Sequence, residues 1–408
     1  MARALEKWYF HAAAKVLNFL PQKIPTLYTG AGSIKFLPAE LASRKVSKPL
    51  IITDRTLMAN GVVGRVAKVL DLSRMGYAIF DGVVKEPTFA LCADAVALLK
   101  DEACDSVVAV GGGWVTDSAK IVRMGATHSK PLVKFAGRFK CGNEGLPFIC
   151  VPAAAGTGSE ATSFAIVMDA AKRKELLVSD PKLPADIAIL DPEITVEVSA
   201  FDTAIAGLHA LTHAFEAYTN TLHYSDVDAQ SMEAVRLVFG NLRAAYADGL
   251  DLNAREALLR AAHLAGRASA RGCVGYVHAL AHRFGELYDV QRGVSIGILL
   301  PKFARLYAKI CPERLEELDR VSRSGGGAKE ISAARSTKRD NESAMAFADS
   351  VAALAKELGM PEKAKFMRQS DIAAIAKAAA ADVRRAPYPV PAVFSEKELR
   401  EILESVAP

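Results

Sequence analysis

The chain has 408 residues, of which 51% are hydrophobic and 24% are charged, and its formal net charge is +5. This composition is typical of a globular protein with a large core, and the length predicts two or three domains. The net charge is mild and the basic residues are scattered, which argues against a nucleic-acid partner.

The sequence does not indicate a membrane or an oxidising compartment. Its longest apolar runs, such as residues 106–113, have the length of strands rather than of membrane-spanning helices. The N-terminal stretch contains Glu6 and lacks a small-residue cleavage site. The six cysteines form no CxxC pair and no dense framework. We therefore expect a reduced, cytoplasmic protein without a membrane partner.

Short apolar strands alternate with helical segments between residues 25 and 191. Helical periodicity is found at 58–73 and 88–103, between the predicted strands. This alternation predicts a parallel sheet that is covered by helices on both faces. The predicted strands are PLIITD (49–54), YAIFDGV (77–83), SVVAVGGG (106–113) and FICVPAAAG (148–156).

The pattern changes after residue 192. Nearly every later segment has helical periodicity and is rich in alanine and leucine. We therefore predict an α/β domain over residues 1–195 and an all-helical domain over residues 196–408. The polar, glycine-rich stretch 322–341 predicts an exposed loop.

Two loops and one acidic residue that follow predicted strands each allow two interpretations. The glycines at 111–113 would let backbone N–H groups approach a phosphate at a helix N-terminus, or would serve only a tight turn. The loop AGTGSE (155–160) suits close approach to a ligand, or caps a helix. Asp54 would bind a ribose hydroxyl, or cap the segment after it. These residues by themselves leave both interpretations open.

Four of the eight histidines form two HxxxH pairs, His209 with His213 and His278 with His282. Both segments have helical periodicity and no internal proline, so each pair places two imidazoles on one helix face. Two such helices can build a metal or proton-transfer site. The alternative is a set of hydrogen-bonded core or surface histidines, but two pairs with a glycine-rich loop upstream favour the functional site.

Five motifs follow one another along the chain: GGGWVTDSAK, PAAAGTGSEAT, AILDPEIT, AGLHALTHAFEAYT and GYVHALAHRFGELYDVQRGVSIGILLP. Together they resemble the iron-containing, or group III, alcohol dehydrogenase family, whose fold is like that of dehydroquinate synthase. The resemblance spans about residues 27–301. It implies a dinucleotide-binding α/β domain, an all-helical metal and substrate domain, and an active site in the cleft between them. It also implies NAD, with NADP as the alternative, a divalent iron or zinc ion, and a homo-oligomer.

The resemblance assigns roles to individual residues. His213 and His278 match two metal ligands, His209 stands at a third ligand position, and His282 matches a histidine of the catalytic cleft. Asp54 matches the position that favours NAD over NADP. Lys120 matches the basic position of the glycine motif. The residues that match cofactor-binding positions are Asp54, Gly111, Gly112, Gly113, Trp114, Asp117, Thr157 and Gly158.

Two of the four metal-ligand positions depart from the family pattern. His209 replaces the carboxylate of GxDAxxH, and Arg292 replaces the histidine that precedes a glycine. The site loses an anion and gains a cation, and arginine has no lone pair to donate. In one interpretation His209, His213 and His278 still hold a zinc-like ion. In the other no metal binds, Arg292 binds the carbonyl oxygen or an anionic substrate group, and His282 relays the proton.

Further departures fall in the nucleotide site. Trp114 replaces the serine of the usual GGGS, Ala153 and Ala154 replace paired threonines, and Glu86 replaces the asparagine before Pro87. The changes add bulk and remove hydrogen-bonding groups near the expected diphosphate. Together with the metal-site changes they suggest altered chemistry or weakened activity.

The main functional hypothesis is an oxidoreductase that moves hydride between NAD(P)(H) and a small alcohol or aldehyde, one that bears an anionic group if Arg292 binds substrate. Two alternatives remain at this point. One is a lyase like dehydroquinate synthase, and the other is a non-catalytic or metal-free relative that keeps the fold.

Overall fold

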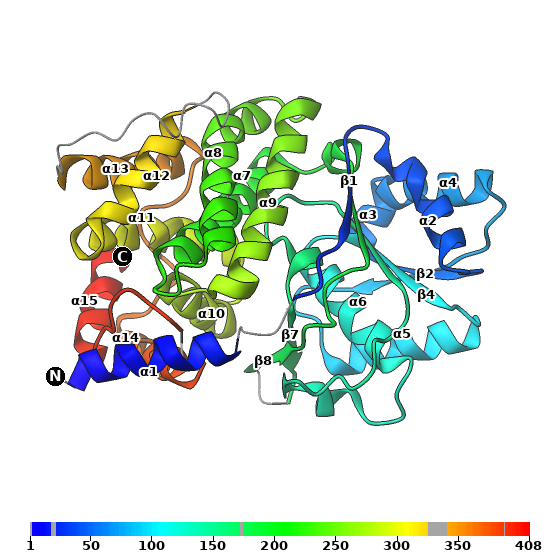
Figure 1. Cartoon of the computed structure of the whole chain (residues 1–408), viewed down its shortest axis with the longest axis horizontal. Helices are drawn as coiled ribbons and strands as arrows, with labels where there is room; N and C mark the ends of the chain where they lie inside the picture. The colour runs from blue at the N-terminus through cyan, green and yellow to red at the C-terminus, as the bar shows by residue number, and fades with distance from the viewer. Residues whose placement is uncertain (1, 18–21, 172–173, 325–340, 387) are drawn as a thin grey trace. The chain divides into compact units, whose positions relative to one another are not determined.

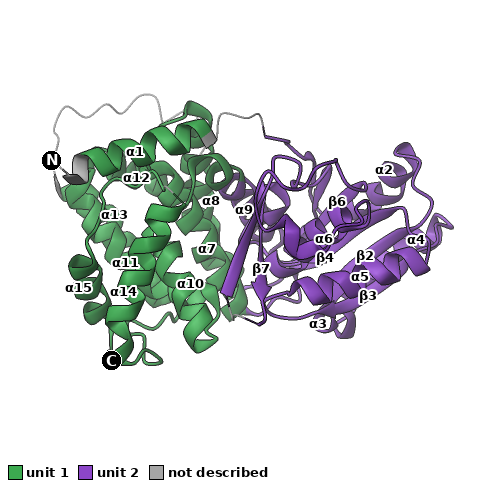
Figure 2. Cartoon of the chain, turned by 90° about the horizontal axis from the view of Figure 1, so that it is seen from below, with its two compact units in different colours: residues 1–20, 200–247, 267–408 green, residues 21–199, 248–266 purple. Residues whose placement is uncertain are grey.

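The computed structural model describes residues 2–17, 22–171, 174–324, 341–386 and 388–408. It divides into two compact units (Figure 2): a helical unit of residues 1–20, 200–247 and 267–408, and an α/β unit of residues 21–199 and 248–266. The contiguous domains 1–195 and 196–408 remain a prediction, and each unit is described by itself below. The predicted loop at 322–341 lies mostly on residues 325–340, outside the described residues.

The α/β unit is built on a six-stranded, fully parallel sheet (Figure 1) with the order β1-β9-β6-β4-β2-β3. The predicted strands correspond to β2, β3, β4 and β6, and the parallel sheet is confirmed. The strands of this sheet are β1 (Thr26–Thr29), β2 (Pro49–Asp54), β3 (Ala78–Val83), β4 (Ser106–Gly111), β6 (Phe148–Pro152) and β9 (Ile187–Leu190).

Side-chain alternation along the central strands creates two apolar layers, one on each face of the sheet. In β4, Val107 and Ala109 belong to one buried cluster, and Val108 and Val110 belong to the other. Helices α5 (Phe89–Asp101) and α6 (Gly113–Gly125) supply the first cluster, whereas α2 (Leu37–Ser43) and α4 (Val62–Leu72) supply the second. The sheet is therefore covered on both faces, as predicted for strands that are apolar on both sides.

The strand order reverses between β2 and β4. The chain leaves β2 through α3 (Arg55–Ala59) and α4 toward one edge of the sheet, and it leaves β4 through α6 toward the other edge. In open parallel sheets, ligands bind outside the carboxyl ends of the strands at such a reversal. Asp54 ends β2 and Gly111 ends β4, so the predicted cofactor residues lie at this point.

Local turn chemistry explains where the helices differ from the prediction. The segment predicted as one helix at 58–73 is divided into α3 and α4, because Gly61 has a φ of 82°. The α/β unit also holds a small second sheet of order β5-β8-β7, whose antiparallel β7–β8 pair was not predicted. Its strands are β5 (Gly137–Arg138), β7 (Phe164–Asp169) and β8 (Lys174–Ser179). The short 3-10 helices among the described residues are Ser33–Phe36, Leu132–Phe135, Ser159–Ala161, Pro192–Thr195 and Gln369–Asp371.

The helical unit is arranged around α7 (Ala200–Thr219), which contacts α8, α11 and α12. Residues 207–219 of α7 are buried on every side, so this helix forms the centre of the unit. No helix within the described ranges is both long and apolar enough to cross a membrane. The other helices are α1 (Ala2–Leu17), α8 (Ser225–Ala247), α9 (Leu252–Gly272, shared with the α/β unit), α10 (Tyr276–Tyr288), α11 (Arg292–Ile310), α12 (Pro312–Arg323), α13 (Asn341–Glu357), α14 (Ile372–Arg385) and α15 (Glu396–Val406).

The fold predicts that Gly158 cannot be replaced without loss of stability. Its φ is +61°, and an added Cβ would lie 2.1 Å from the carbonyl oxygen of Ala262 in α9. The left-handed conformation and the overlap together should make Gly158→Ala lower the free energy of unfolding by about 2 kcal/mol or more. Urea denaturation measures this change. Gly64→Ala is the control, because Gly64 lies in α4 with open space around it and should tolerate alanine. Equal stability of the two variants would contradict the prediction.

Candidate metal and nucleotide sites

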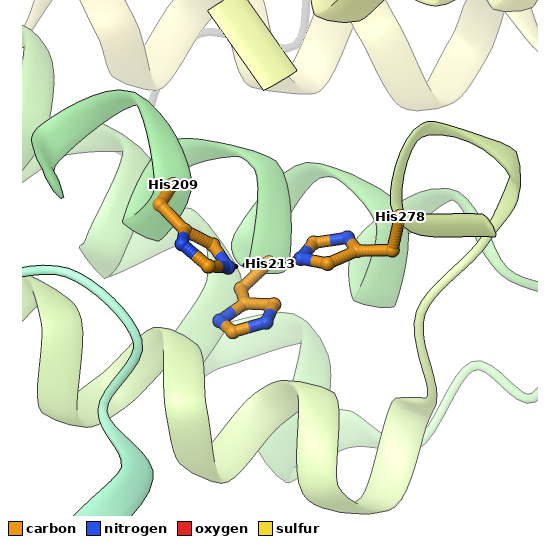
Figure 3. A group of neighbouring side chains, drawn as sticks. All are labelled: His209, His213 and His278. Carbon is orange, nitrogen blue, oxygen red and sulfur yellow. Dashed lines mark hydrogen bonds between the residues drawn. The ribbon is translucent and has the colours of Figure 1, made fainter. Parts of the chain in front are cut away.

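Three buried histidines converge in the helical unit (Figure 3). Their candidate ligand atoms all lie within 4.8 Å of one another. The Nε2 atoms of His209 and His278 are 3.1 Å apart, and the rings of His213 and His278 are stacked with centroids 4.5 Å apart. Among the described residues, these histidines form the one cluster that meets the geometric requirement for a metal ion.

Two helices bring these imidazoles together. His209 and His213 are four residues apart on α7, so they share one face of that central helix. His278 comes from the first turn of α10, and its ring points toward the other two (Figure 3). The predicted HxxxH geometry therefore holds on both helices, but His282 lies one turn further along α10, with its ring centroid 6.4 Å from that of His278.

Burial keeps the imidazoles in the form that can bind a metal. Removal from water lowers the pKa of both His209 and His278 well below the usual value, and the nearby histidines and Arg292 lower the pKa of both further. These two rings are therefore neutral at pH 7. A neutral imidazole keeps one nitrogen lone pair, which is what a zinc-type ion requires.

A carboxylate that the sequence analysis did not single out lies against the cluster. Glu216 is on the same face of α7 as the two histidines, seven residues after His209, and it accepts a 2.6 Å hydrogen bond from Nδ1 of His278. Burial raises the pKa of Glu216 to about 7, opposed by hydrogen bonds from backbone N–H groups of α10. The spacing HxxxHxxE was the signal in the sequence that would have identified it.

Arg292 is placed near the histidines by a close helix contact. It is the first residue of α11, and the next residue, Gly293, packs so closely on Ile205 of α7 that a Cβ there would lie 2.6 Å from the Ile205 side chain. Ile205 is one helical turn before His209. The positive charge of Arg292 consequently reaches His209 and His278, whose pKa values it lowers.

The glycine loop of the α/β unit has room for a ligand at one of its three positions. A Cβ at Gly111 would lie 2.5 Å from Val115, and a Cβ at Gly113 would lie 3.0 Å from Thr157, so packing accounts for both glycines. Gly112 has an ordinary φ of −81°, and its added Cβ would meet nothing within 4 Å. Gly112 is the N-cap of α6, where no side chain of the described residues caps the first turn. Open space at an uncapped helix N-terminus suits a phosphate group.

The remaining candidate cofactor residues have structural partners within the α/β unit. Asp54 caps α3 by accepting from the N–H of Leu57 at 3.0 Å. The carboxylate of Asp117 accepts from Ser159 Oγ and from the N–H of Ile166. Trp114, in the first turn of α6, is partly buried and packs against the apolar cluster that α5 and α6 form on one face of the sheet. The structure gives each a local role, and their contacts to cofactor remain a prediction.

The residues present fit both groups that the fold calls for. Three buried imidazoles whose candidate ligand atoms converge suit a divalent ion, and the open position at Gly112 suits a dinucleotide phosphate. A parallel sheet with a phosphate-type loop at its point of reversal, and a helical unit carrying a histidine cluster, are the features expected of a nicotinamide-dependent oxidoreductase.

Comparisons with known proteins identify the family. Residues 25–192 match the family model of iron-containing alcohol dehydrogenases, and residues 203–407 match that of the C-terminal region of the Fe-containing alcohol dehydrogenase family. Alcohol dehydrogenase 4 of Saccharomyces cerevisiae is 32% identical over 306 residues, which are 75% of this chain and 80% of the relative. The 1,3-propanediol dehydrogenase of Klebsiella pneumoniae is 38% identical over 274 residues, which are 66% of this chain and 70% of the relative.

A solved structure supports the same conclusion. The crystal structure of a 1,3-propanediol oxidoreductase has a TM-score of 0.88 and 29% identity, and the match covers 95% of this chain and 99% of the other. The chain belongs to the iron-containing alcohol dehydrogenase family. It is an oxidoreductase that transfers hydride between NAD(P)(H) and a small alcohol or aldehyde. Family membership implies NAD(H) and an iron or other divalent ion as cofactors.

The geometry at Gly112 predicts separate effects on binding and on stability. In Gly112→Ala, the new methyl group would occupy the open space in front of α6 and hold a phosphate away from the N–H groups. Loss of a hydrogen bond to a charged group weakens binding by about 10- to 100-fold. Fluorescence titration with NADH measures the affinity, and urea denaturation should show stability within about 0.5 kcal/mol of wild type. Unchanged NADH affinity would contradict the assignment of Gly112 to the phosphate site.

Proposed function

We propose that this enzyme holds a catalytic divalent ion on His209, His213 and His278, and that Arg292 selects aldehydes or alcohols bearing an anionic group. The observation that carries the metal proposal is the convergence of three buried imidazoles within 4.8 Å. When bound, the ion would polarise the substrate oxygen and NAD(H) would accept or supply the hydride. We further propose a cytoplasmic homo-oligomer that favours NAD through Asp54 and accepts NADP less well.

The other residues act by binding and by proton transfer. Backbone N–H groups of Gly112 and Gly113 at the start of α6 bind the cofactor diphosphate, next to the loop of Thr157 and Gly158. His282, half-exposed on α10, gives or takes the proton of the substrate oxygen through an imidazole nitrogen. Its place one turn beyond His278 supports this role.

Arg292 supports a substrate with a negative charge. Its charge is permanent, since a guanidinium does not lose its proton in proteins, and it binds carboxylate or phosphonate groups through paired N–H donors. Arg292 is partly exposed at the N-terminus of α11, where the helix dipole adds further positive potential.

Removal of one histidine should remove the metal. We expect about one zinc or iron ion per wild-type chain by elemental mass spectrometry, and less than a tenth of that in His213→Ala, because two imidazoles alone hold a divalent ion weakly. His128→Ala is the control, since His128 lies in the α/β unit and bonds the carbonyl of Met124 at 2.8 Å. A metal-free wild-type protein that retains turnover would contradict the three-histidine site and favour Arg292 as the electrophile.

Replacement of Arg292 should change substrate preference. The test compares succinic semialdehyde with butyraldehyde, which has the same carbon chain without the carboxylate. In Arg292→Ala, kcat/KM for succinic semialdehyde should fall about 10- to 100-fold relative to that for butyraldehyde. This fold-change corresponds to the free energy of one charge-assisted hydrogen bond. Arg305→Ala is the matched control on the same helix, where Arg305 pairs with Asp349 at 2.6 Å. An unchanged ratio of the two kcat/KM values would overturn this role of Arg292.

A further inference from the structure

The carboxylate of Glu216 accepts hydrogen bonds from backbone and side-chain donors at the N-terminal end of α10. Oε2 accepts from the N–H of Gly275 at 2.8 Å and from Nδ1 of His278 at 2.6 Å, and Oε1 accepts from the N–H of Val277 at 2.7 Å. The side chain of Glu216 is only 1% exposed, so water does not compete for these oxygens. A carboxylate with three donors around it has one stable arrangement.

The sequence around α10 makes room for this carboxylate. Gly275 is the N-cap and has no side chain of its own with which to cap the helix. A Cβ at Gly275 would lie 2.9 Å from Oε1 of Glu216, so any larger residue would push the carboxylate away. Glu216 therefore replaces the missing cap, and the positive end of the α10 dipole favours its negative charge.

The same contacts determine which nitrogen of His278 carries the proton. Because two backbone donors and the ring all point at Glu216, the hydrogen between Nδ1 and Oε2 belongs to the ring. The lone pair of His278 is then on Nε2, the atom that lies 3.1 Å from Nε2 of His209 in the cluster. The opposite tautomer would place an N–H, with no lone pair, where the other histidines converge.

We propose that Glu216 is a positioning residue that fixes His278 as its Nδ1–H tautomer and so presents the Nε2 lone pair to the cluster. Histidine ligands of metals commonly donate their second N–H to a carboxylate, and loss of that partner weakens metal binding about 10- to 100-fold. This proposal rests on the proposed function, because the orientation of His278 matters only if the three histidines bind a cation.

The variant Glu216→Gln tests the proposal. An amide cannot accept from all three donors, and in one orientation its NH2 group would donate to Nδ1 and reverse the tautomer. Long-range proton–nitrogen NMR of the metal-free, histidine-labelled protein reports the tautomer, with His278 assigned by the signals lost in His278→Gln. We expect Nδ1–H in wild type and a mixture or the Nε2–H form in Glu216→Gln. Wild-type His278 as the Nε2–H form would overturn the proposal even if the variant did not fold.

Cobalt titration, read by visible absorption, gives the second readout. Glu216→Gln should bind Co²⁺ about 10- to 100-fold more weakly than wild type. Glu160→Gln is the matched control: Glu160 and His263 form a second buried carboxylate–histidine pair, at 3.1 Å, in the α/β unit. That change should leave Co²⁺ affinity within about twofold, since a lost charge-assisted bond elsewhere affects stability rather than metal affinity.

The two readouts separate the two proposals. If wild type shows the Nδ1–H tautomer and Glu216→Gln loses it, but neither binds Co²⁺, the role of Glu216 stands and the metal site is wrong. If wild type binds Co²⁺ and Glu216→Gln retains both the tautomer and the affinity, the metal site stands and the role of Glu216 is wrong. A fall in stability without a change in tautomer would assign Glu216 to helix capping alone, which also contradicts the proposal.

Discussion

The helical unit depends on the burial of a polar cluster in its central helix. Three imidazoles and one carboxylate lie within the core around α7, each at most 7% exposed. Buried polar groups cost free energy unless they are hydrogen-bonded or hold an ion. The cluster tolerates burial because the lowered pKa values keep His209 and His278 uncharged, and because the carboxylate of Glu216 accepts hydrogen bonds from donors at the start of α10. A well-packed apolar core would avoid this cost, and the proposed metal site gives a reason for the polar cluster.

The α/β unit obeys a different constraint, which is the space at the carboxyl ends of β2, β4 and β6. The three consecutive glycines at this edge of the sheet are glycine for different physical reasons. Gly111 and Gly113 are required by Val115 and by Thr157, whereas nothing in the described protein crowds Gly112. The buried Lys120 adds rigidity below this loop, because it donates to Ser159, Thr162 and the carbonyl of Phe164. A rigid loop with one open position is suited to a ligand that approaches the backbone.

The sequence predicted the fold correctly where the same pattern of apolar residues recurred along the chain. Apolar strands such as 49–54 and 106–111, buried on both faces, could only belong to a covered parallel sheet. Strands β7 and β8 were not predicted, because their residues are mostly half-buried and do not form the continuous apolar run of a central strand. Glu86 stands where the family pattern has asparagine, and its φ of 56° shows that the backbone there is left-handed, a conformation that asparagine tolerates well.

The sequence predicted the candidate site residues that are spaced regularly along one helix. It did not predict the residues whose role depends on contact with a distant segment. His209, His213 and His278 were found because four-residue spacing places side chains on one face. Glu216 was not found, because its role depends on α10 packing against α7 at Gly275, a contact between segments 59 residues apart in the chain. The contact between His263 and Glu160 was not predicted for the same reason, because the two residues are 103 positions apart in the chain.

The charges around the cluster link the altered ligands to the substrate. Relative to the family pattern, His209 removes one negative charge and Arg292 adds one positive charge, so the site is two charges more positive. In the proposed site, a bound divalent ion would lie near the positive charge of Arg292, which already lowers the pKa values of His209 and His278. Repulsion between like charges is stronger in a partly buried site than in water. An anionic group on the substrate would reduce it at the moment of binding. The two substitutions are therefore consistent with the proposed preference for a negatively charged substrate, and the proposed metal and substrate should bind more tightly together than either does alone.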